Sequence, residues 1–376
     1  MDSEFSLYIH IPFCSSFCDY CDFYSVKTEN ISDEYIDNYL CAIINDIKNQ
    51  IKHFSAENIV TAYIGGGTPS VLEKKIGFLI KELNKIPCFK PEEFTIEANP
   101  ESLTEDFLRI CRENGVNRLS LGVQTFHEPS RKQVNRKGDI NIINKNISLA
   151  SEYYKNAVSF DLITGLPYQN EDIIKNDINK ILAFNPCHVS LYSLTIEDDT
   201  LLKEKINKKL TELPAGDKAD SLWIFGRNIL IENGFKNYEI SNFAKEGSEC
   251  KHNLRYWNME SWLAAGAASC ATIINNKKPC ASRFTRANDI DAYIKNHSLD
   301  AAIFEEINRD TLLKESLLMG FRCKEQPFRN IFKERFGITI EDCIPDTLLK
   351  YSNADIMLFL NSFIADAFKE LDSKKL

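Results

Sequence analysis

The sequence lacks an uninterrupted apolar run of about 18 residues, the length that a membrane-spanning helix requires. Its first ten residues, MDSEFSLYIH, include acidic side chains rather than the basic and then apolar regions of a secretory signal. It also lacks an excess of positive charge, because the net charge is -9 at pH 7. Such a field repels phosphates and opposes non-specific binding to nucleic acid or anionic lipid. We therefore expect a cytoplasmic protein with no integral membrane segment and no nucleic-acid partner.

Internal repeats of solenoid type and low-complexity linkers are absent as well. The 376 residues, 44% hydrophobic and 26% charged, have the composition of a folded protein with one large domain and a smaller one. Of the twelve cysteines, all but three are scattered singly through apolar or amphipathic segments. There a free cysteine behaves as a small hydrophobic residue, so a disulfide framework is not expected.

Short apolar or β-branched runs alternate with segments of helical periodicity over the first 235 residues. Clear helical patterns occupy residues 35–51 and 76–86. This alternation predicts an α/β fold with a parallel sheet, as a partial (β/α)6 barrel of the TIM type, whose site gathers where the strands end. The expected strands are SLYIHI at 6–11, VTAYIG at 60–65, EFTIEA at 93–98, RLSLGV at 118–123, VSFDLI at 158–163 and HVSLYSL at 188–194.

The pattern changes at residue 236. Residues 236–287 form a polar, loop-like stretch that ends in a segment of small residues, and they are predicted to connect two domains. Residues 288–376 are mainly helical in pattern, with a short hairpin expected near RFGITI at 335–340. We therefore divide the chain into a barrel at 1–235, a connection at 236–287 and a small C-terminal helical domain at 288–376.

Three cysteines cluster in the stretch YIHIPFCSSFCDYCDF, with Cys14, Cys18 and Cys21 in the spacing C-x3-C-x2-C. Thiolates hold iron–sulfur clusters, and this spacing lets one loop supply three ligands. Three ligands leave one iron open, as a catalytic metal site keeps one position for a substrate. Spacing alone leaves two alternatives: a zinc site completed by a distant cysteine or histidine, and three ordinary cysteines.

A glycine-rich turn, GGGTPS, follows the second expected strand. Consecutive glycines permit positive φ angles and a close approach of the backbone to a ligand, and their amides can bind a polar group. Together, the cysteine spacing after a first strand and this turn after the second resemble the radical S-adenosylmethionine superfamily. The resemblance implies a [4Fe–4S] cluster on Cys14, Cys18 and Cys21, with S-adenosylmethionine bound at the open iron.

Further stretches resemble one branch of that superfamily, which contains oxygen-independent coproporphyrinogen III oxidases and HemW-like heme chaperones. The matching stretches are LYIHIPFC, CDYCDF, GGGTPS, IEANPESL, NRLSLGVQTF, FDLITGLPYQ, YEISNFAKEGSECKHNLRYW and ERFGI. In this family Arg136 would pair with the methionine carboxylate, and strand-end polar groups would bind the ribose or the amino group. The cofactor-binding residues implied by the resemblance are Tyr8, Tyr20, Gly66, Gly67, Thr68, Glu97, Gln124, Arg136 and Asp161.

Three features resemble the chaperones more than the oxidases. The oxidases carry an extension before the first strand, whereas the first expected strand here begins near residue 6. They also carry a further cysteine two positions after the third cluster cysteine, where this chain has Phe23. HNLRYW at 252–257 resembles the chaperone motif H-N-x-x-Y-W, which makes His252 an expected heme ligand and places Tyr256 and Trp257 against the macrocycle. The chain departs from the family at Gly138 and Ala268, where histidines are usual.

The resemblance therefore implies a HemW-like heme chaperone that passes heme to an acceptor protein, such as a respiratory hemoprotein. It also implies an electron donor of the flavodoxin or ferredoxin kind. Two alternatives stay open. One is an oxygen-independent coproporphyrinogen III oxidase, which decarboxylates propionates oxidatively in porphyrin biosynthesis. The other is an iron–sulfur or heme-binding module that does not cleave S-adenosylmethionine.

Overall fold

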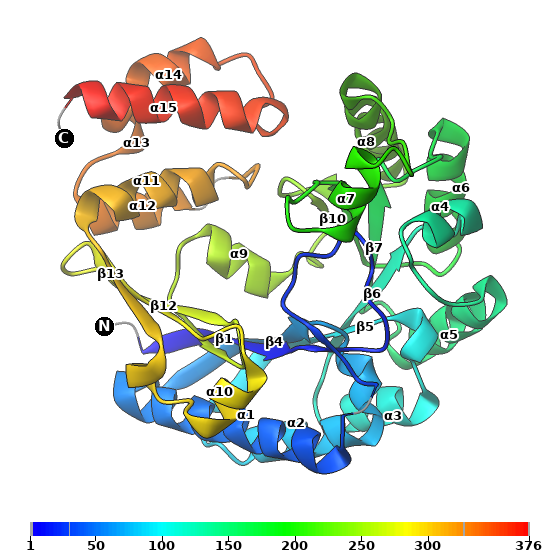
Figure 1. Ribbon diagram of the computed structural model, residues 1–376. Helices are drawn as coiled ribbons and strands as arrows, with labels where there is room; N and C mark the ends of the chain where they lie inside the picture. Colours follow the sequence, from blue (N-terminus) through cyan, green and yellow to red (C-terminus); the bar gives the residue numbers. More distant parts are fainter. Residues whose placement is uncertain (1–2, 30, 326–327, 375–376) are drawn as a thin grey trace.

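The computed structural model describes residues 3–29, 31–325 and 328–374, and within them one sheet of 12 strands dominates (Figure 1). Six neighbouring parallel strands form its centre, in chain order, which confirms the predicted α/β partial barrel. Each coincides with one of the six expected runs. They are β1 (Glu4–Ile11), β4 (Asn58–Gly66), β5 (Phe89–Ala98), β6 (Arg118–Gln124), β7 (Val158–Thr164) and β8 (His188–Ser193).

Helices cover the outer face of this curved sheet (Figure 1). Several begin at a side chain that accepts a hydrogen bond from a first-turn amide, as Ser32 does from Tyr35 and Asn170 does from Ile173. The helices that follow the strands are α1 (Asp33–Phe54), α2 (Ile76–Asn84), α3 (Glu105–Glu113), α4 (Glu128–Gln133), α5 (Ile140–Tyr153), α6 (Glu171–Leu182), α7 (Leu201–Asn207) and α8 (Gly216–Glu232).

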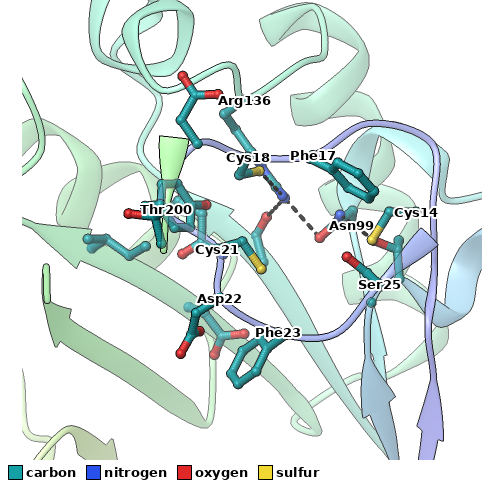
Figure 2. Close-up of a pocket in the computed structure, with 18 of the residues that line it drawn as sticks. Cys14, Phe17, Cys18, Cys21, Asp22, Phe23, Ser25, Asn99, Arg136 and Thr200 are labelled. Carbon is teal, nitrogen blue, oxygen red and sulfur yellow. Dashed lines mark hydrogen bonds between the residues drawn. The ribbon is translucent and has the colours of Figure 1, made fainter. Parts of the chain in front are cut away.

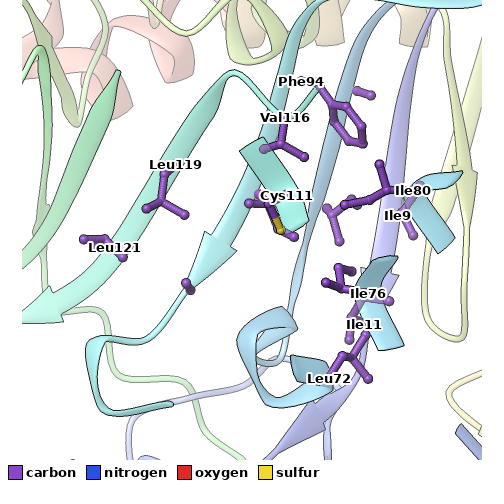
Figure 3. Packing of buried hydrophobic residues seen from close by; sticks show 14 of the residues in the cluster. Ile9, Ile11, Leu72, Ile76, Ile80, Phe94, Cys111, Val116, Leu119 and Leu121 are labelled. Atoms are coloured by element: carbon purple, nitrogen blue, oxygen red, sulfur yellow. The ribbon is translucent and has the colours of Figure 1, made fainter. Parts of the chain in front are cut away.

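The two faces of the sheet differ in polarity. Along β5, Phe94 and Ile96 are buried in the apolar core with α2 and α3 (Figure 3). On the other face, the alternate residues Glu93 and Glu97 accept hydrogen bonds, and Thr95 lies between them. TIM-type barrels usually fill their interior with branched apolar side chains. This barrel instead has a polar interior, which suits polar or charged ligands.

The segment predicted as a loop-like connection is more structured than expected. It contains β9 (Lys236–Asn237), β10 (Asn242–Ala244), α9 (Lys251–Trp257), β11 (Trp262–Ala265), β12 (Cys270–Asn275) and β13 (Cys280–Thr285). Strand β10 pairs with β8 and β11 pairs with β1, so the chain crosses from one edge of the central six strands to the other. The prediction of a loop-like stretch is wrong because β9, β10 and β11 are too short to carry a periodic signal, and the longer β12 and β13 do not alternate strictly between apolar and polar residues.

The C-terminal part is mainly helical, as predicted, and has a separate apolar core that includes Phe321, Phe332 and Phe363. Its elements are α10 (Ile290–Lys295), β14 (Ile303–Ile307), α11 (Arg309–Gly320), α12 (Phe328–Phe336), α13 (Ile340–Cys343), α14 (Pro345–Lys350) and α15 (Leu360–Lys374). The hairpin expected at 335–340 is not formed, because these residues end α12 and begin α13. The domain boundaries stay a prediction, and Ile290 and Tyr293 pack with the barrel core. No helix in the described part of the chain is long and apolar enough to cross a membrane.

Candidate functional site

The three clustered cysteines lie on a loop at the carboxyl ends of the parallel strands. Two short paired strands, β2 (Phe13–Cys14) and β3 (Val26–Lys27), hold the ends of this loop together. Cys14 is buried, Cys18 is partly exposed and Cys21 is exposed. All three line one cavity of about 590 Å³ (Figure 2). The structure therefore brings the predicted cluster ligands to one site.

The three thiols are not grouped closely enough to form a metal centre in this conformation. Among the residues that the structure describes, no three histidine, cysteine or acidic side chains have metal-holding geometry. Burial raises the pKa of the Cys14 thiol, and it raises the pKa of Cys21 to about 11. Because iron binds thiolates, Cys14 and Cys21 would have to lose these protons to serve as ligands of a cluster.

Arg136 connects the cysteine loop to residues at the ends of β5 and β6. Its guanidinium donates to Asn99 Oδ1 at 2.8 Å and to the carbonyl of Gly122, forms an ion pair with Glu101 at 3.3 Å, and reaches Cys18 Sγ at 3.5 Å (Figure 2). Burial lowers the pKa of Arg136, but Glu101, Tyr20 and Cys18 raise it by more, so it lies above its usual value. The guanidinium therefore places a permanent positive charge 3.5 Å from the Cys18 sulfur.

The glycine-rich turn joins β4 to the 3-10 helix η1 (Pro69–Lys75) and forms one wall of the cavity. Gly66 has a φ of 109°, a region that glycine adopts without strain. The amide of Gly67 donates to the Ile11 carbonyl at 2.8 Å, and that of Thr68 donates to the Phe13 carbonyl at 2.8 Å. The turn is thereby attached directly to the first residues of the cysteine loop.

Two partly buried carboxyl groups, those of Glu97 and Asp161, line the cavity. Glu97 accepts from the Tyr63 hydroxyl at 2.7 Å and from the Gly66 amide at 3.2 Å, and Asp161 accepts from Ser120 at 3.2 Å. Burial, with the repulsion of Asp161, raises the pKa of Glu97 to about 7. Burial raises the pKa of Asp161 to about 6. The pair therefore titrates close to neutral pH.

The cavity contains more acidic than basic side chains. It also contains the side-chain oxygen of Gln124, which could accept a hydrogen bond from a ligand. Gln124 has a positive φ of 68°, and its buried Oε1 has no hydrogen-bond partner among the residues that the structure describes. The residues that line the cavity include one guanidinium, that of Arg136, and five carboxyl groups. This charge distribution favours a ligand that carries positive charge. The carboxyl groups belong to Asp19, Asp22, Glu97, Asp161 and Asp199.

Of the predicted cofactor residues, all line the cavity except Tyr8. Tyr20 lines it and packs with the apolar cluster that contains Leu202 under α7. The Tyr8 hydroxyl is 3.1 Å from His10 Nδ1, and its ring stacks on Tyr63 with centroids 6.3 Å apart. Tyr8 therefore lies beside the cavity wall without forming part of it.

The H-N-x-x-Y-W motif forms α9, which Figure 1 shows against the concave side of the sheet. His252 is 1% exposed. Its Nδ1 is 2.9 Å from the Thr61 hydroxyl and its Nε2 is 3.1 Å from the Tyr256 hydroxyl. Burial lowers the pKa of the imidazole to about 3, so the ring is neutral. In this conformation both nitrogens of the expected heme ligand are already engaged, which the sequence did not reveal.

Tyr256 and Trp257, the other residues expected to contact heme, are partly exposed at the same helix. The Tyr256 ring packs edge-on against Trp262, and the Arg322 guanidinium lies 4.9 Å from the Trp257 ring. The indole nitrogen of Trp257 is buried, and it has no hydrogen-bond partner in the described part of the chain. None of the three motif residues lines the large cavity, so the structure separates them from the cysteine loop.

The two departures from the family pattern lie in special backbone conformations. Gly138 has a φ of 107°, and a Cβ there would lie 3.0 Å from Glu101 Cβ, so a histidine at this position would be strained. Ala268 also has a positive φ, of 64°. The local backbone explains the glycine, while nothing in the structure explains the alanine.

Sequence reasoning missed three polar residues that organise the site. Asn99 accepts from Arg136 and donates to the Thr68 hydroxyl at 3.0 Å. Glu101 pairs with Arg136, and Glu93 accepts from the amides of Lys251 and His252. The position of Asn99 and Glu101 directly after a buried strand was the available signal, since such positions meet at the site edge. Glu93 gave no such signal.

Comparisons with known proteins agree with this geometry. The model of the Radical SAM superfamily matches residues 8–181. Heme chaperone HemW of Lactococcus lactis is 33% identical over 359 residues, which cover 92% of this chain and 90% of that protein. Heme chaperone HemW of Bacillus subtilis is 31% identical over 346 residues, covering 91% and 90%. The solved structure of Escherichia coli coproporphyrinogen III oxidase (HemN), a radical SAM enzyme, has a TM-score of 0.77 at 21% identity, covering 97% and 89%, and shares the fold.

Proposed function

Because this chain belongs to the HemW family of the radical SAM superfamily, we propose that it is a heme chaperone that binds heme and transfers it to an acceptor protein. The observation that carries the proposal is the similarity to curated chaperones along nine-tenths of their length. The position of Phe23, which is 66% exposed on the cysteine loop, agrees with it because the oxidases have a cysteine there.

The charge of the cavity argues against the oxidase alternative. Coproporphyrinogen III carries four propionates, and binding them requires basic side chains. Arg136 is the one basic residue among those that line the cavity, and it is already paired with Glu101. Asp22, Asp161 and Asp199, together with Glu97 when it is ionised, would repel such a substrate, whereas Asp19 is paired with Lys205.

The residues of the cavity fit the cofactors of the superfamily. Cys14, Cys18 and Cys21 would hold a [4Fe–4S] cluster, and the open iron would bind S-adenosylmethionine, whose reductive cleavage yields a 5′-deoxyadenosyl radical. Glu97 and Asp161 supply negative charge for the ammonium and sulfonium groups. The backbone of the glycine-rich turn and the free Oε1 of Gln124 offer hydrogen bonds. Tyr20 and the segment before α7 form a further part of the cavity wall.

The electron donor and the acceptor are further parts of the proposal. We propose a flavodoxin- or ferredoxin-type donor, because the cluster would receive one electron at a time. The exposure of Cys21 and Phe23 would let a small electron-transfer protein approach the cluster edge. We also propose a cytoplasmic location and a respiratory hemoprotein as acceptor.

Glu97 gives the binding of S-adenosylmethionine a dependence on pH. Its pKa of about 7 means that it is mostly protonated below that value, and a cation binds the ionised carboxylate better. The affinity should therefore rise by up to about ten-fold from about pH 6 to about pH 8. Among the groups that face Glu97, Asp161 titrates at about 6, while burial keeps the pKa of the Tyr63 and Tyr192 hydroxyls far above this range.

Equilibrium dialysis of S-adenosylmethionine against cluster-loaded protein at several pH values measures this effect. In Glu97→Gln the rise should shrink to the part that Asp161 supplies. A wild-type affinity that stays flat, or an equal rise in the variant, would contradict the role of Glu97.

The contacts of His252 in the motif helix lead to a separate prediction about heme affinity. Ligation of iron by His252 requires that Nε2 leave the hydroxyl of Tyr256, 3.1 Å away. Tyr256→Phe removes this competing hydrogen bond and keeps the ring. A hydrogen bond is worth about 1 kcal/mol net, so heme should bind about five-fold more tightly to the variant. His252→Ala should lose binding, and weaker binding by Tyr256→Phe would oppose His252 as the ligand.

Anaerobic titration of the cluster-loaded protein with heme tests the proposed function. We expect saturation near one heme per chain, followed by loss of the bound-heme absorbance when an apo-hemoprotein is added. The same protein, reduced and supplied with S-adenosylmethionine and coproporphyrinogen III, should release no carbon dioxide. Absence of saturable heme binding, with carbon dioxide release, would establish the oxidase instead.

A further inference from the structure

Tyr63 lies between the large cavity and the motif helix α9 and contacts both. Its hydroxyl donates to Glu97 Oε1 at 2.7 Å, and the other oxygen of Glu97 accepts from the Gly66 amide in the cavity wall. Its ring lies with its centroid 5.2 Å from that of His252. One side chain therefore contacts a cavity carboxylate through its hydroxyl and the motif imidazole through its ring.

The motif helix is anchored to the same two strands that end in the cavity. On β5, Glu93 accepts from the amides of Lys251 at 3.0 Å and His252 at 2.9 Å. On β4, the Thr61 hydroxyl is 2.9 Å from His252 Nδ1. On β5, Glu97 lies four residues after Glu93, and β4 ends at Gly66. Each of these two strands therefore contacts the motif helix and also contributes a residue to the cavity.

Tyr63 is closely packed, so it has little room to stay in place when a side chain that it contacts moves. Its ring stacks on Tyr8, with centroids 6.3 Å apart, on the strand beside it. Closely packed side chains transmit displacements because they have few alternative positions. A ligand that pulls the Glu97 carboxylate into the cavity therefore shifts or releases the Tyr63 hydroxyl, and the ring on His252 responds.

We propose that Tyr63 is a positioning residue that couples the occupancy of the cavity to the orientation of His252. This inference rests on the proposed function, because the ligands it connects are S-adenosylmethionine and heme. Coupling between two binding sites is reciprocal: each ligand changes the affinity of the other by the same factor. The cofactor would then set how tightly the chaperone holds its heme.

Heme affinity measured with and without S-adenosylmethionine tests the coupling. In the wild type we expect the cofactor to change the dissociation constant of heme by about five-fold or more. In Tyr63→Phe, which keeps the ring and loses the bond to Glu97, the change should fall below about two-fold while both ligands still bind. Tyr153→Phe is the matched control, because it removes a Tyr–Glu hydrogen bond, of 3.1 Å to Glu105, from the surface.

An equal change in the wild type and in Tyr63→Phe, or none in the wild type, would overturn the proposal. Amide hydrogen exchange of residues 251–257, with and without S-adenosylmethionine, gives a readout that needs no heme. A cofactor-dependent exchange rate that disappears in Tyr63→Phe supports the coupling, and identical rates in all samples oppose it. If no variant binds heme, the chaperone proposal fails, and the exchange data still decide the role of Tyr63.

Discussion

Replacing Cys14, Cys18 and Cys21 together by alanine should abolish iron binding. Anaerobic reconstitution should load the wild type with about four irons and four sulfides per chain and the variant with less than one iron. The three thiols line one cavity, and Arg136 provides positive charge beside Cys18. Iron analysis and the visible absorbance of the cluster measure the difference. This is the largest expected effect, because three ligands disappear together.

Other cysteines provide the control. Cys41 is exposed on α1 and Cys111 is buried in the apolar core, and neither lines the cavity. Cys41→Ala should retain the full iron content. Equal iron in the triple variant and in the wild type would mean that the metal is held elsewhere, which would refute the cluster site and favour a different reading of the loop.

Gly67→Ala should separate the glycine-rich turn from the cysteine loop. A Cβ at this position would lie 2.8 Å from the Phe13 carbonyl oxygen and 2.9 Å from that of Ile11. These backbone oxygens accept hydrogen bonds from Thr68 and from Gly67 itself, so neither can retreat without breaking a bond. Overpacking of this kind costs about 2 kcal/mol, and we expect a loss of S-adenosylmethionine affinity of about ten-fold or more.

Gly216→Ala is the matched control for this substitution. Gly216 begins α8, and a Cβ there would meet no atom within 4 Å. The thermal unfolding midpoint of the Gly216→Ala protein and its affinity for S-adenosylmethionine should stay close to those of the wild type. If Gly67→Ala binds S-adenosylmethionine as tightly as Gly216→Ala does, the turn does not form the wall of the cofactor site.

The sequence predicted the barrel well because its strands are long and strongly patterned. Apolar residues such as Phe94 and Ile96 alternate with Thr95 and Glu97, and this period of two both marks the strand and separates its faces. The cysteine spacing and the glycine-rich turn are local in sequence, so they too were readable. Their meeting at one cavity follows from the rule that parallel strands end at the same edge.

The sequence could not predict contacts between distant segments. Glu93 and His252 are 159 positions apart, and nothing in either neighbourhood indicates that a carboxylate on β5 holds the start of α9. For the same reason the sequence predicted His252 as an available ligand for heme iron, although both of its nitrogens lie within hydrogen-bond distance of the hydroxyls of Thr61 and Tyr256. Strands of a few residues, such as β10 and β11, were missed because their pairing depends on the long strands beside them.

The central claim is that a loop with three cysteines leaves one iron open to S-adenosylmethionine at the acidic end of the barrel. Electron paramagnetic resonance of the reduced, reconstituted protein tests it directly, because a ligand on the open iron alters the spectrum of the cluster. We expect the spectrum to change on addition of S-adenosylmethionine in the wild type and to change only at higher concentration in Gly67→Ala. A spectrum that is identical with and without the cofactor would show that the open iron does not bind it.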